Sequence, residues 1–357
     1  MVVFPPEEEQ HGEKQISEVI GFYLLNEGNM GSNKATLDYY DYATAIYSRN
    51  IYANANPDVP KELGDVGNDL KIYGGRLYAV INCSNKVEVM DAKTAKRIGQ
   101  VDIPNCRYIA FDGKYAYVTS YAGPVSLDAS HAQIGYVARI DTATLQIDGQ
   151  CLVGYQPDEL AVADGKLYVA NSGGYMAPDY DSTVSVIDIA SFTETKRITV
   201  AKNLHRARTD RHGQLWVSSR GDYYGTPAKL YCLDTKSDAV VDSLDVAVSA
   251  LDILGDSLYA CATTWDYINN EDVVSYAIVD VRTHKVRTTN FITDGTEQKI
   301  KKPYGIKVHP LTRDTYVTDA KYYVNPGMLH CYGQDGVLKW SVRTGDIPAH
   351  MAFVVER

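Results

Sequence analysis

Short runs in which apolar and polar residues alternate recur along the whole chain, and each run contains an aromatic residue. Examples are "GRLYAV" at residues 75–80, "GKLYVA" at 165–170 and "GQLWVS" at 213–218. A period of two indicates strands with one buried face, and no segment has the 3.6-residue period of a helix. The aromatic residues recur at intervals of 39 to 57 residues: Tyr23, Tyr78, Tyr117, Tyr168, Trp216, Tyr259 and Tyr316. This spacing predicts seven copies of one unit.

Each copy contains the same sequence of turns and strands. A short strand and a tight turn, such as Asp164-Gly165, precede the aromatic strand. A loop follows it, and then a strand that closes on Asp, as in "VARIDTAT" and "VSVIDIAS", where the Asp side chain starts a turn. A fourth strand ends the unit. Four strands repeated at about 49 residues predict an all-β, seven-bladed β-propeller.

The two chain ends complete this arrangement. Residues 349–356, "AHMAFVVE", match the first strand of a unit, whereas the segment that starts at Gly21 matches the second strand. We therefore expect the C-terminal strand to join the N-terminal blade and to close the ring. The segment "PPEEE" is typical of a solvated tether, so we assign residues 1–18 to a flexible tether and 19–357 to the propeller.

Composition and charge narrow the possible partners. The net charge of −10 and the absence of a basic stripe argue against nucleic acid. No apolar run is long enough for a signal segment or a membrane span, so we expect a cytoplasmic protein or one whose targeting segment has been removed.

The six cysteines show no metal or redox spacing. Cys232, Cys261 and Cys331 lie in strand-like runs and are expected to be small buried residues. Cys83 and Cys106 lie near loops, and the sequence leaves open whether they form a disulfide.

The long connections between strands lie on one face of the predicted ring. Because neighbouring strands are antiparallel, the loops between second and third strands share a face with the connections between blades. These loops are long, as in "NSGGYMAPDYDS" at residues 171–182, and they carry nine rings: Tyr121, Tyr175, Tyr180, Tyr223, Tyr224, Trp265, Tyr267, Tyr322 and Tyr323. The chain has 28 Tyr against 6 Phe, a bias that suits a surface both apolar and hydrogen-bonding.

We predict a ligand-binding surface on this face. Its residues come from the long loops and from the connections that lead into the innermost strands: Asp69, Arg107, Tyr121, Asp158, Glu159, Tyr175, Tyr180, His205, Arg206, Arg220, Tyr223, Trp265, Tyr267, Tyr304, Tyr322 and His350. The alternative for any single ring is that it packs within its own loop.

Sequence motifs for catalysis are absent: there is no H-E-x-x-H, no G-x-S-x-G and no P-loop. We therefore expect a protein that is not an enzyme and has no cofactor or resident metal. A lyase or hydrolase that uses His205, His350 and the neighbouring acids remains an alternative. A further alternative is that four loop carboxylates bind Ca²⁺: Asp179, Asp181, Asp222 and Asp272. We favour the interpretation that these side chains are solvated.

Two segments carry a resemblance to known families. The pattern "GKLYVANS" followed by "VSVIDIASFTETKRITVAKNLHRA" resembles the repeats of YncE-type propellers. The opening "GFYLLNEGNMGSNKATLDYYD" resembles surface-layer propeller lipoproteins of Bacteroidetes, which include the BtuG-type cobalamin-binding proteins. The resemblance implies a lipid-anchored protein on the outer surface of the outer membrane. It would capture vitamin B12 or related corrinoids and pass them to a TonB-dependent transporter that it caps.

The resemblance and the residues agree on a possible ligand. A corrinoid is a flat macrocycle edged with amides, which suits a wide rim of aromatic rings and hydrogen-bonding side chains. The chain has no lipid-accepting Cys at its N-terminus, so membrane contact through an anchor presupposes a processed form. A propeller scaffold that binds a protein or a glycan is the principal alternative, because exposed Tyr and Trp suit that role equally.

Overall fold

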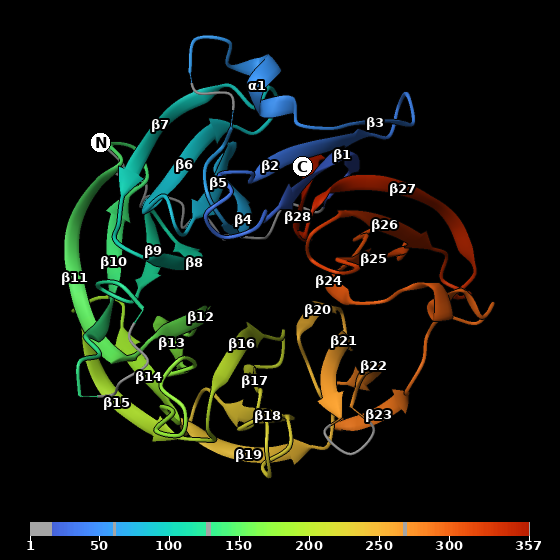
Figure 1. Ribbon diagram of the computed structural model, residues 1–357. Helices are drawn as coiled ribbons and strands as arrows, with labels where there is room; N and C mark the ends of the chain where they lie inside the picture. Colours follow the sequence, from blue (N-terminus) through green and yellow to red (C-terminus); the bar gives the residue numbers. More distant parts are fainter. Residues whose placement is uncertain (1–15, 60–61, 126–129, 267–269, 357) are drawn as a thin grey trace, which may run out of the picture.

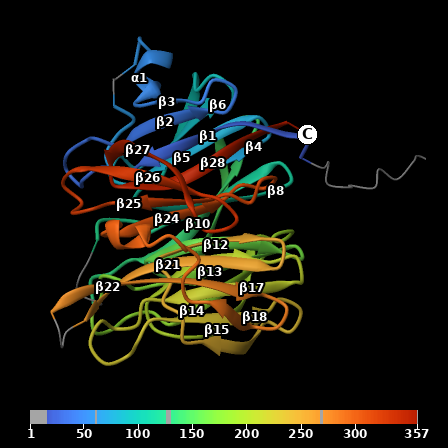
Figure 2. The same ribbon diagram turned by 90° about the vertical axis from the view of Figure 1, so that its right-hand side faces the viewer.

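The computed structural model describes residues 16–59, 62–125, 130–266 and 270–356. The chain forms a ring of seven antiparallel sheets with four strands each, as the sequence predicts (Figure 1). An edge-on view shows the sheets stacked around the ring with their strands twisted relative to one another (Figure 2). A propeller of this kind leaves only short outer edges exposed.

The innermost strands of the seven blades together surround the central axis (Figure 1). In chain order the inner strands are β4 (Gly67–Tyr73), β8 (Cys106–Asp112), β12 (Pro157–Ala163), β16 (Leu204–Thr209), β20 (Ala250–Leu254), β24 (Pro303–Val308) and β28 (Pro348–Glu356). The second strands are β1 (Glu18–Asn26), β5 (Arg76–Ile81), β9 (Tyr115–Ser120), β13 (Lys166–Asn171), β17 (Gln214–Ser219), β21 (Ser257–Asp266) and β25 (Thr315–Asp319).

The third and fourth strands complete each blade toward the outside. The third strands are β2 (Thr36–Asp41), β6 (Lys86–Asp91), β10 (Ile134–Asp141), β14 (Thr183–Asp188), β18 (Lys229–Asp234), β22 (Glu271–Asp280) and β26 (Pro326–Tyr332). The fourth strands are β3 (Ile46–Ser48), β7 (Arg97–Asp102), β11 (Gln146–Tyr155), β15 (Thr193–Thr199), β19 (Ala239–Leu244), β23 (Lys285–Thr288) and β27 (Leu338–Asp346).

The C-terminal strand closes the ring, as predicted. β28 pairs antiparallel with β1, with Phe22 opposite Phe353 and Leu24 opposite Met351. The backbone N–H of Ser17 also donates to the carbonyl of Glu356 at 3.0 Å. β1 begins at Glu18, next to the predicted boundary between tether and propeller.

The recurrent aromatic residues all lie in second strands, where the repeat places them, and all except Tyr259 are almost fully buried. In two of them a polar atom hydrogen-bonds to a neighbouring turn. The Tyr168 hydroxyl donates to Asp238 Oδ1 at 2.6 Å, and Trp216 Nε1 donates to Asp210 Oδ2 at 2.9 Å. The rings thus fill the blades, and in these two the polar atom stays hydrogen-bonded.

The turns use the residues that the repeat predicts. Asp91 Oδ1 accepts hydrogen bonds from the backbone N–H groups of Lys93 and Thr94 at 3.0 and 2.9 Å after the third strand. Asp164 and Gly165 both have positive φ, 48° and 73°, as a two-residue hairpin turn requires.

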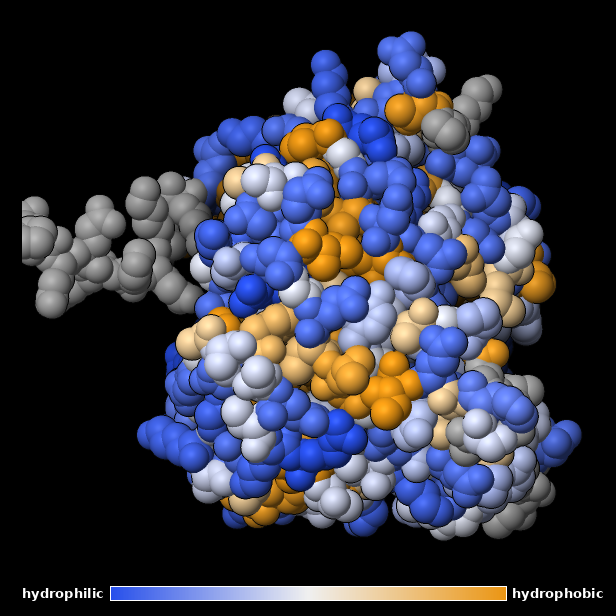
Figure 3. All heavy atoms as spheres, turned by 90° about the vertical axis from the view of Figure 1, so that its left-hand side faces the viewer, coloured by the Kyte–Doolittle hydropathy of each residue, from blue (hydrophilic) through white to orange (hydrophobic). Residues whose placement is uncertain are grey.

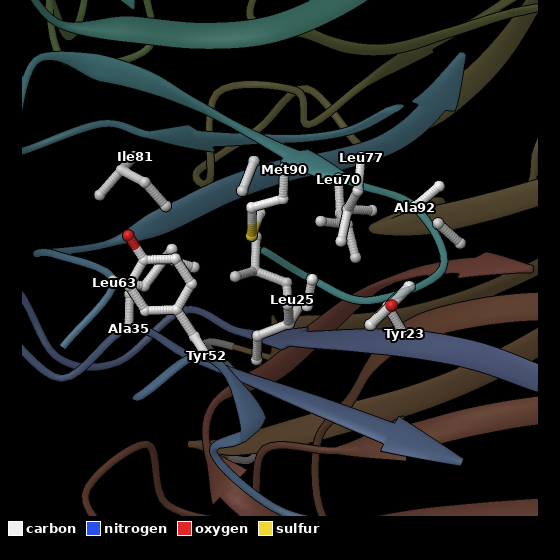
Figure 4. Packing of buried hydrophobic residues seen from close by; sticks show 14 of the residues in the cluster. Tyr23, Leu25, Ala35, Tyr52, Leu63, Leu70, Leu77, Ile81, Met90 and Ala92 are labelled. Atoms are coloured by element: carbon white, nitrogen blue, oxygen red, sulfur yellow. The ribbon is translucent and has the colours of Figure 1, made fainter. Parts of the chain in front are cut away.

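A short insertion separates the first blade from the second and was not predicted. Residues after β3 form the helix α1 (Ile51–Ala55), which places Tyr52 in the apolar core between these blades (Figure 4). The Tyr52 hydroxyl donates to Glu88 Oε1 at 3.0 Å. One turn is too short to produce a hydrophobic period, which is why the sequence pattern gave no sign of it. Within the described ranges, the other helical element is the 3-10 turn η1 (Thr296–Lys299).

One predicted loop is mostly strand. The sequence predicts a long loop around Trp265, but β21 and β22 extend into this segment, with Trp265 paired with Asp272. Thr263, Thr264 and Val273 are β-branched and favour the extended hairpin.

All six cysteines are free, so the disulfide between Cys83 and Cys106 does not form. Cys106, Cys232, Cys261 and Cys331 are buried, as small apolar residues are expected to be.

Figure 3 shows one part of the side wall of the ring face-on. The side that carries β10 and β11 is mostly hydrophilic, with apolar residues gathered toward its middle (Figure 3). In the part of the chain that the structure describes, no helix is long and apolar enough to cross a membrane.

Candidate ligand-binding cavity

One end of the central channel opens into a cavity of about 880 Å³, which we name the rim cavity. Its walls come from the first residues of inner strands and from the chain between second and third strands. Inner strands contribute Asn68, Arg107, Tyr108, His205, Arg206 and Tyr304, and the other walls include Met30, Cys83, Tyr175, Arg220, Tyr223, Tyr224, Trp265 and Tyr323. Cavities of this size are typical of sites for cofactor-sized ligands.

Eight of the sixteen predicted residues line the rim cavity: Arg107, Tyr175, His205, Arg206, Arg220, Tyr223, Trp265 and Tyr304. Seven others are placed outside this lining: Asp69, Tyr121, Asp158, Glu159, Tyr180, Tyr322 and His350. Tyr267 lies outside the described residues. A residue that the sequence places on the correct face of the ring therefore does not always line the cavity.

A recurrent β-bulge determines how the inner strands present their side chains. In β8 the pairing with β9 passes from Cys106–Ser120 to Ile109–Val118, so two residues, Arg107 and Tyr108, oppose one. β12, β16 and β24 have equivalent bulges, at residues 158–159, 205–206 and 304–305. Bulges redirect side chains and are frequent beside functional sites.

Hydroxyl groups of the second strands hold three of these bulges. Thr119 Oγ1 accepts a hydrogen bond from the backbone N–H of Tyr108 at 3.0 Å, and Ser218 Oγ accepts one from Arg206 at 3.0 Å. Thr318 Oγ1 does the same for Gly305 at 2.7 Å. The bulge N–H groups, which the β-ladder leaves without a partner, are thereby satisfied.

Asp158 lies beneath the cavity wall and anchors three of its neighbours. Its carboxylate accepts hydrogen bonds from the Tyr121 hydroxyl at 2.9 Å and from Arg220 Nη1 at 3.0 Å. Arg107 Nε lies 3.6 Å from Asp158 Oδ1, and the Arg107 guanidinium lies 4.7 Å from the centre of the Tyr121 ring. Asp158 and Tyr121 are thus supports that position Arg107 and Arg220, which line the cavity.

Tyr108, His205 and Arg206 form a second buried group. The Tyr108 hydroxyl lies 3.2 Å from His205 Nε2 and accepts a hydrogen bond from Arg206 Nη1 at 3.1 Å. Arg206 Nε donates to the Ser249 carbonyl at 2.9 Å. Burial, together with the nearby charges of Arg220, Arg206 and Arg107, holds the pKa of His205 well below its usual value. His205 is therefore a neutral imidazole at physiological pH, and its Nε2 is hydrogen-bonded to the Tyr108 hydroxyl.

The depressed pKa of His205 predicts a loss of stability in mild acid. The unfolded chain binds a proton on this residue below about pH 6.5 and the folded chain does not, so the free energy of unfolding falls as the pH drops through 6.5. Between pH 7.5 and 5.5 the loss from this group is on the order of 1 kcal/mol. Urea unfolding of the wild type and His205→Gln at both pH values measures it. Parallel losses in the two proteins would contradict this assignment.

The opposite wall of the cavity contains a carboxylate that the sequence did not single out. Glu27 Oε2 accepts a hydrogen bond from the Tyr304 hydroxyl at 2.9 Å, and Glu27 Oε1 lies 3.2 Å from His350 Nε2. Burial and then the Glu27 charge raise the pKa of Tyr304 well above its usual value, so Tyr304 stays a neutral donor. Nothing in the sequence distinguishes Glu27 from other loop carboxylates.

The loop carboxylates are used within the protein. Asp222 Oδ1 accepts hydrogen bonds from the backbone N–H groups of Tyr224, Gly225 and Thr226, and Asp272 pairs with Lys302 at 2.6 Å. Among the described residues, no group of three or more His, Cys, Asp or Glu side chains is arranged to hold a metal ion.

The predicted residues that do not line the rim cavity include one at the exposed surface and others deeper in the channel. Tyr322 is 62% exposed, whereas its neighbour Tyr323 lines the cavity, with its ring centre 5.8 Å from that of Tyr304. Asp69 and His350 line a second cavity of about 750 Å³ at the other end of the channel, which we name the opposite cavity. Arg206 lines both cavities and therefore lies at the boundary between them.

Three buried carboxylates below that boundary fasten neighbouring inner strands to one another. Each accepts a hydrogen bond from a backbone N–H of the next blade, at 3.1 Å, 3.0 Å and 2.9 Å: Asp69 from Ile109, Glu159 from Ala207 and Asp252 from Val308. Each also pairs with a cation of the channel: Asp69 with Lys71, Glu159 with Arg208 and Asp252 with Lys307. Asp69, Glu159 and Asp252 thus each connect the inner strands of two neighbouring blades.

The fold and the rim cavity define the class of protein: a seven-bladed β-propeller with a ligand-sized cavity at one end of its channel. Residues 20–329 match the model of a family described as a domain of unknown function, DUF5074. The chain belongs to this family.

Solved structures support the fold. Hydrazine synthase of Kuenenia stuttgartiensis is similar with a TM-score of 0.62 and 16% identity, over 80% of this chain and 89% of that chain. A protein of unknown function from Bacteroides caccae is similar with a TM-score of 0.51 and 12% identity, over 94% and 99% of the two chains. At these identities the likeness shows the fold alone. No curated protein matches the sequence.

Proposed function

We propose that this propeller is a non-catalytic binding protein that captures a corrinoid, cobalamin or a close relative, in the rim cavity. The observation that carries the proposal is the make-up of that cavity, which combines exposed rings with hydrogen-bonding groups held in place from below. Tyr175, Tyr223 and Trp265 are 46%, 47% and 44% exposed on its walls. Rings fixed on a rigid scaffold bind a large flat ligand with little loss of conformational entropy.

The polar groups of the cavity support binding in preference to catalysis. Glu27 and His205, which line the cavity, and Asp158 beneath its wall are each engaged by a neighbouring Tyr hydroxyl, and Asp272 of the lining is paired with Lys302. They position the wall rather than face a reacting atom. His205 Nε2 is occupied by Tyr108, so we expect the corrinoid to be held by contacts other than ligation of its cobalt.

The wider role rests on the resemblance to surface-layer propeller lipoproteins. We propose a location on the outer surface of the outer membrane, through a lipid anchor, and delivery of the corrinoid to a TonB-dependent transporter. A scaffold that binds a protein or glycan is the second candidate, because apolar side chains near the mouth are highly exposed: Met30 82%, Tyr224 83% and Val324 69%.

Gel filtration tests the proposal directly. Purified protein mixed with cyanocobalamin at micromolar concentration is expected to carry the visible absorbance of the corrinoid in its own peak, at one ligand per chain. Absorbance that elutes entirely at the volume of the free ligand would contradict corrinoid binding.

Two tyrosines of the same loop provide a matched pair of variants. Tyr175 lines the rim cavity, and Tyr180, five residues further along the loop, does not. Tyr175→Ala is expected to lower the affinity for cyanocobalamin about tenfold, as loss of a central aromatic contact does, and to leave the melting temperature nearly unchanged. Tyr180→Ala is expected to keep the wild-type affinity. Calorimetric titration measures both, and equal affinities for the two variants would place the ligand elsewhere.

A further inference from the structure

The walls of the rim cavity contain an excess of positive charge in one place. Arg107, Arg206 and Arg220, which we name the arginine cluster, all line the cavity. Arg107 and Arg220 share the Asp158 carboxylate, and Arg206 is connected to His205 through the Tyr108 hydroxyl. The protein as a whole carries a net charge of −10, which makes three neighbouring arginines an unusual concentration.

Only one carboxylate is shared among the three arginines. Asp158 forms ion pairs with Arg220 and Arg107, at 3.0 and 3.6 Å. Arg206 forms no ion pair with any described residue, and its side chain is held by the neutral Tyr108 hydroxyl and the Ser249 carbonyl. The cluster therefore carries two positive charges more than its partners balance.

The other charged groups of the cavity do not compensate this excess. Asp272 is paired with Lys302, and Glu27 is engaged by Tyr304 and His350. In the opposite cavity, by contrast, the lining cations Lys71, Arg208 and Lys307 each form an ion pair with a buried carboxylate: Asp69, Glu159 and Asp252.

Hydrogen-bond donors in the cluster are also left over. The Arg107 guanidinium donates no hydrogen bond to the described residues, and its Nε, 3.6 Å from Asp158 Oδ1, is buried without a hydrogen-bond partner. Arg206 is only 8% exposed and uses Nε and Nη1 within the protein. A guanidinium has five N–H donors in a planar fork that fits the oxygens of a phosphate or carboxylate. Buried cations with unused donors are costly unless an anion joins them.

We propose that the arginine cluster binds an oxyanion, a phosphate or carboxylate group, at the inner end of the rim cavity. Cobalamin carries such a group, the phosphodiester of its nucleotide loop, and the assignment to that phosphodiester rests on the proposed function. The same oxyanion chemistry is available in a separate phosphate ion. The cluster would then fix the orientation of the ligand, with its anionic group inward and its macrocycle against the aromatic rings.

Arg206→Gln tests the oxyanion site because Arg206 has no carboxylate partner whose loss would disturb the fold. Arg343→Gln is the matched control, since it removes the same charge from an exposed position of the outer strand β27. Calorimetric titrations of both variants and the wild type use three probes: cyanocobalamin, dicyanocobinamide, which lacks the phosphodiester, and inorganic phosphate.

Arg206→Gln is expected to bind cyanocobalamin about tenfold more weakly than Arg343→Gln and to bind dicyanocobinamide equally well. That result assigns the oxyanion to the phosphodiester. If phosphate binds the wild type and Arg343→Gln but not Arg206→Gln, the oxyanion is a separate phosphate ion. This result supports the oxyanion site even when neither corrinoid binds. Failure of both corrinoids to bind would refute only the proposed function. Identical behaviour of the two variants with all three probes would overturn the oxyanion site. An equal loss for both corrinoids without phosphate binding would also overturn it, because Arg206 would then contact the macrocycle.

Discussion

Deletion of residues 348–357 is expected to abolish the cooperative unfolding of this protein. The deletion removes β28, the inner strand of the first blade, and with it the whole ladder to β1. Met351, Ala352 and Val354 are buried, and a fully buried large apolar side chain contributes about 1.5–3 kcal/mol. The lost burial and hydrogen bonds together approach the 5–15 kcal/mol that is typical of a whole domain.

Thermal unfolding followed by circular dichroism measures this effect. Deletion of residues 1–15 is the control, because it shortens the other chain end and leaves the ladder between β1 and β28 intact, so the melting transition should persist. A C-terminal truncation that retained the wild-type transition would show that β28 does not close the ring.

Asp158→Asn is expected to be the most damaging single substitution at the cavity. Its side chain is almost fully buried and is the carboxylate shared by Arg107 and Arg220. Asn leaves both guanidinium groups without a counter-charge, and breaking a buried ion pair costs about 3–5 kcal/mol. We expect about 3 kcal/mol, at the lower end, because the Arg220 side chain is 27% exposed.

Urea unfolding of Asp158→Asn at neutral pH gives this free energy. Tyr121→Phe serves as the control, since it removes a single hydrogen bond to Asp158 and keeps the ring next to Arg107, with an expected cost of about 1 kcal/mol. A loss in Asp158→Asn no larger than that of Tyr121→Phe would mean that the arginines find other counter-charges.

The fold was predictable because the same physical pattern is repeated seven times. A buried aromatic strand recurs in all seven units, and an Asp turn and a tight hairpin recur in most of them, so an error in one copy is corrected by the others. Trp216 in β17 and Tyr168 in β13, for example, occupy equivalent positions. The departures are local and unrepeated: the α1 insertion with Tyr52, and the extension of β21 and β22 around Trp265.

The site was predictable in its face and only partly in its residues. Each residue along an inner strand moves the side chain about 3.3 Å down the channel, so Asn68 lines the rim cavity while Asp69 reaches the opposite one. The bulges then break the alternation on which sequence reasoning depends. At the bulge in β8 both Arg107 and Tyr108 line the rim cavity, although alternation would send one of them away from it.

The central claim is that a corrinoid binds in the rim cavity, and cobalt provides a direct marker for it. Crystals of the protein grown with cyanocobalamin, measured at the cobalt absorption edge, would show the position of the metal as an anomalous peak. We predict one peak per chain within the rim cavity, among Arg107, Tyr175 and Tyr304. A peak in the opposite cavity or on the side wall, or no peak at saturating ligand, would contradict the account.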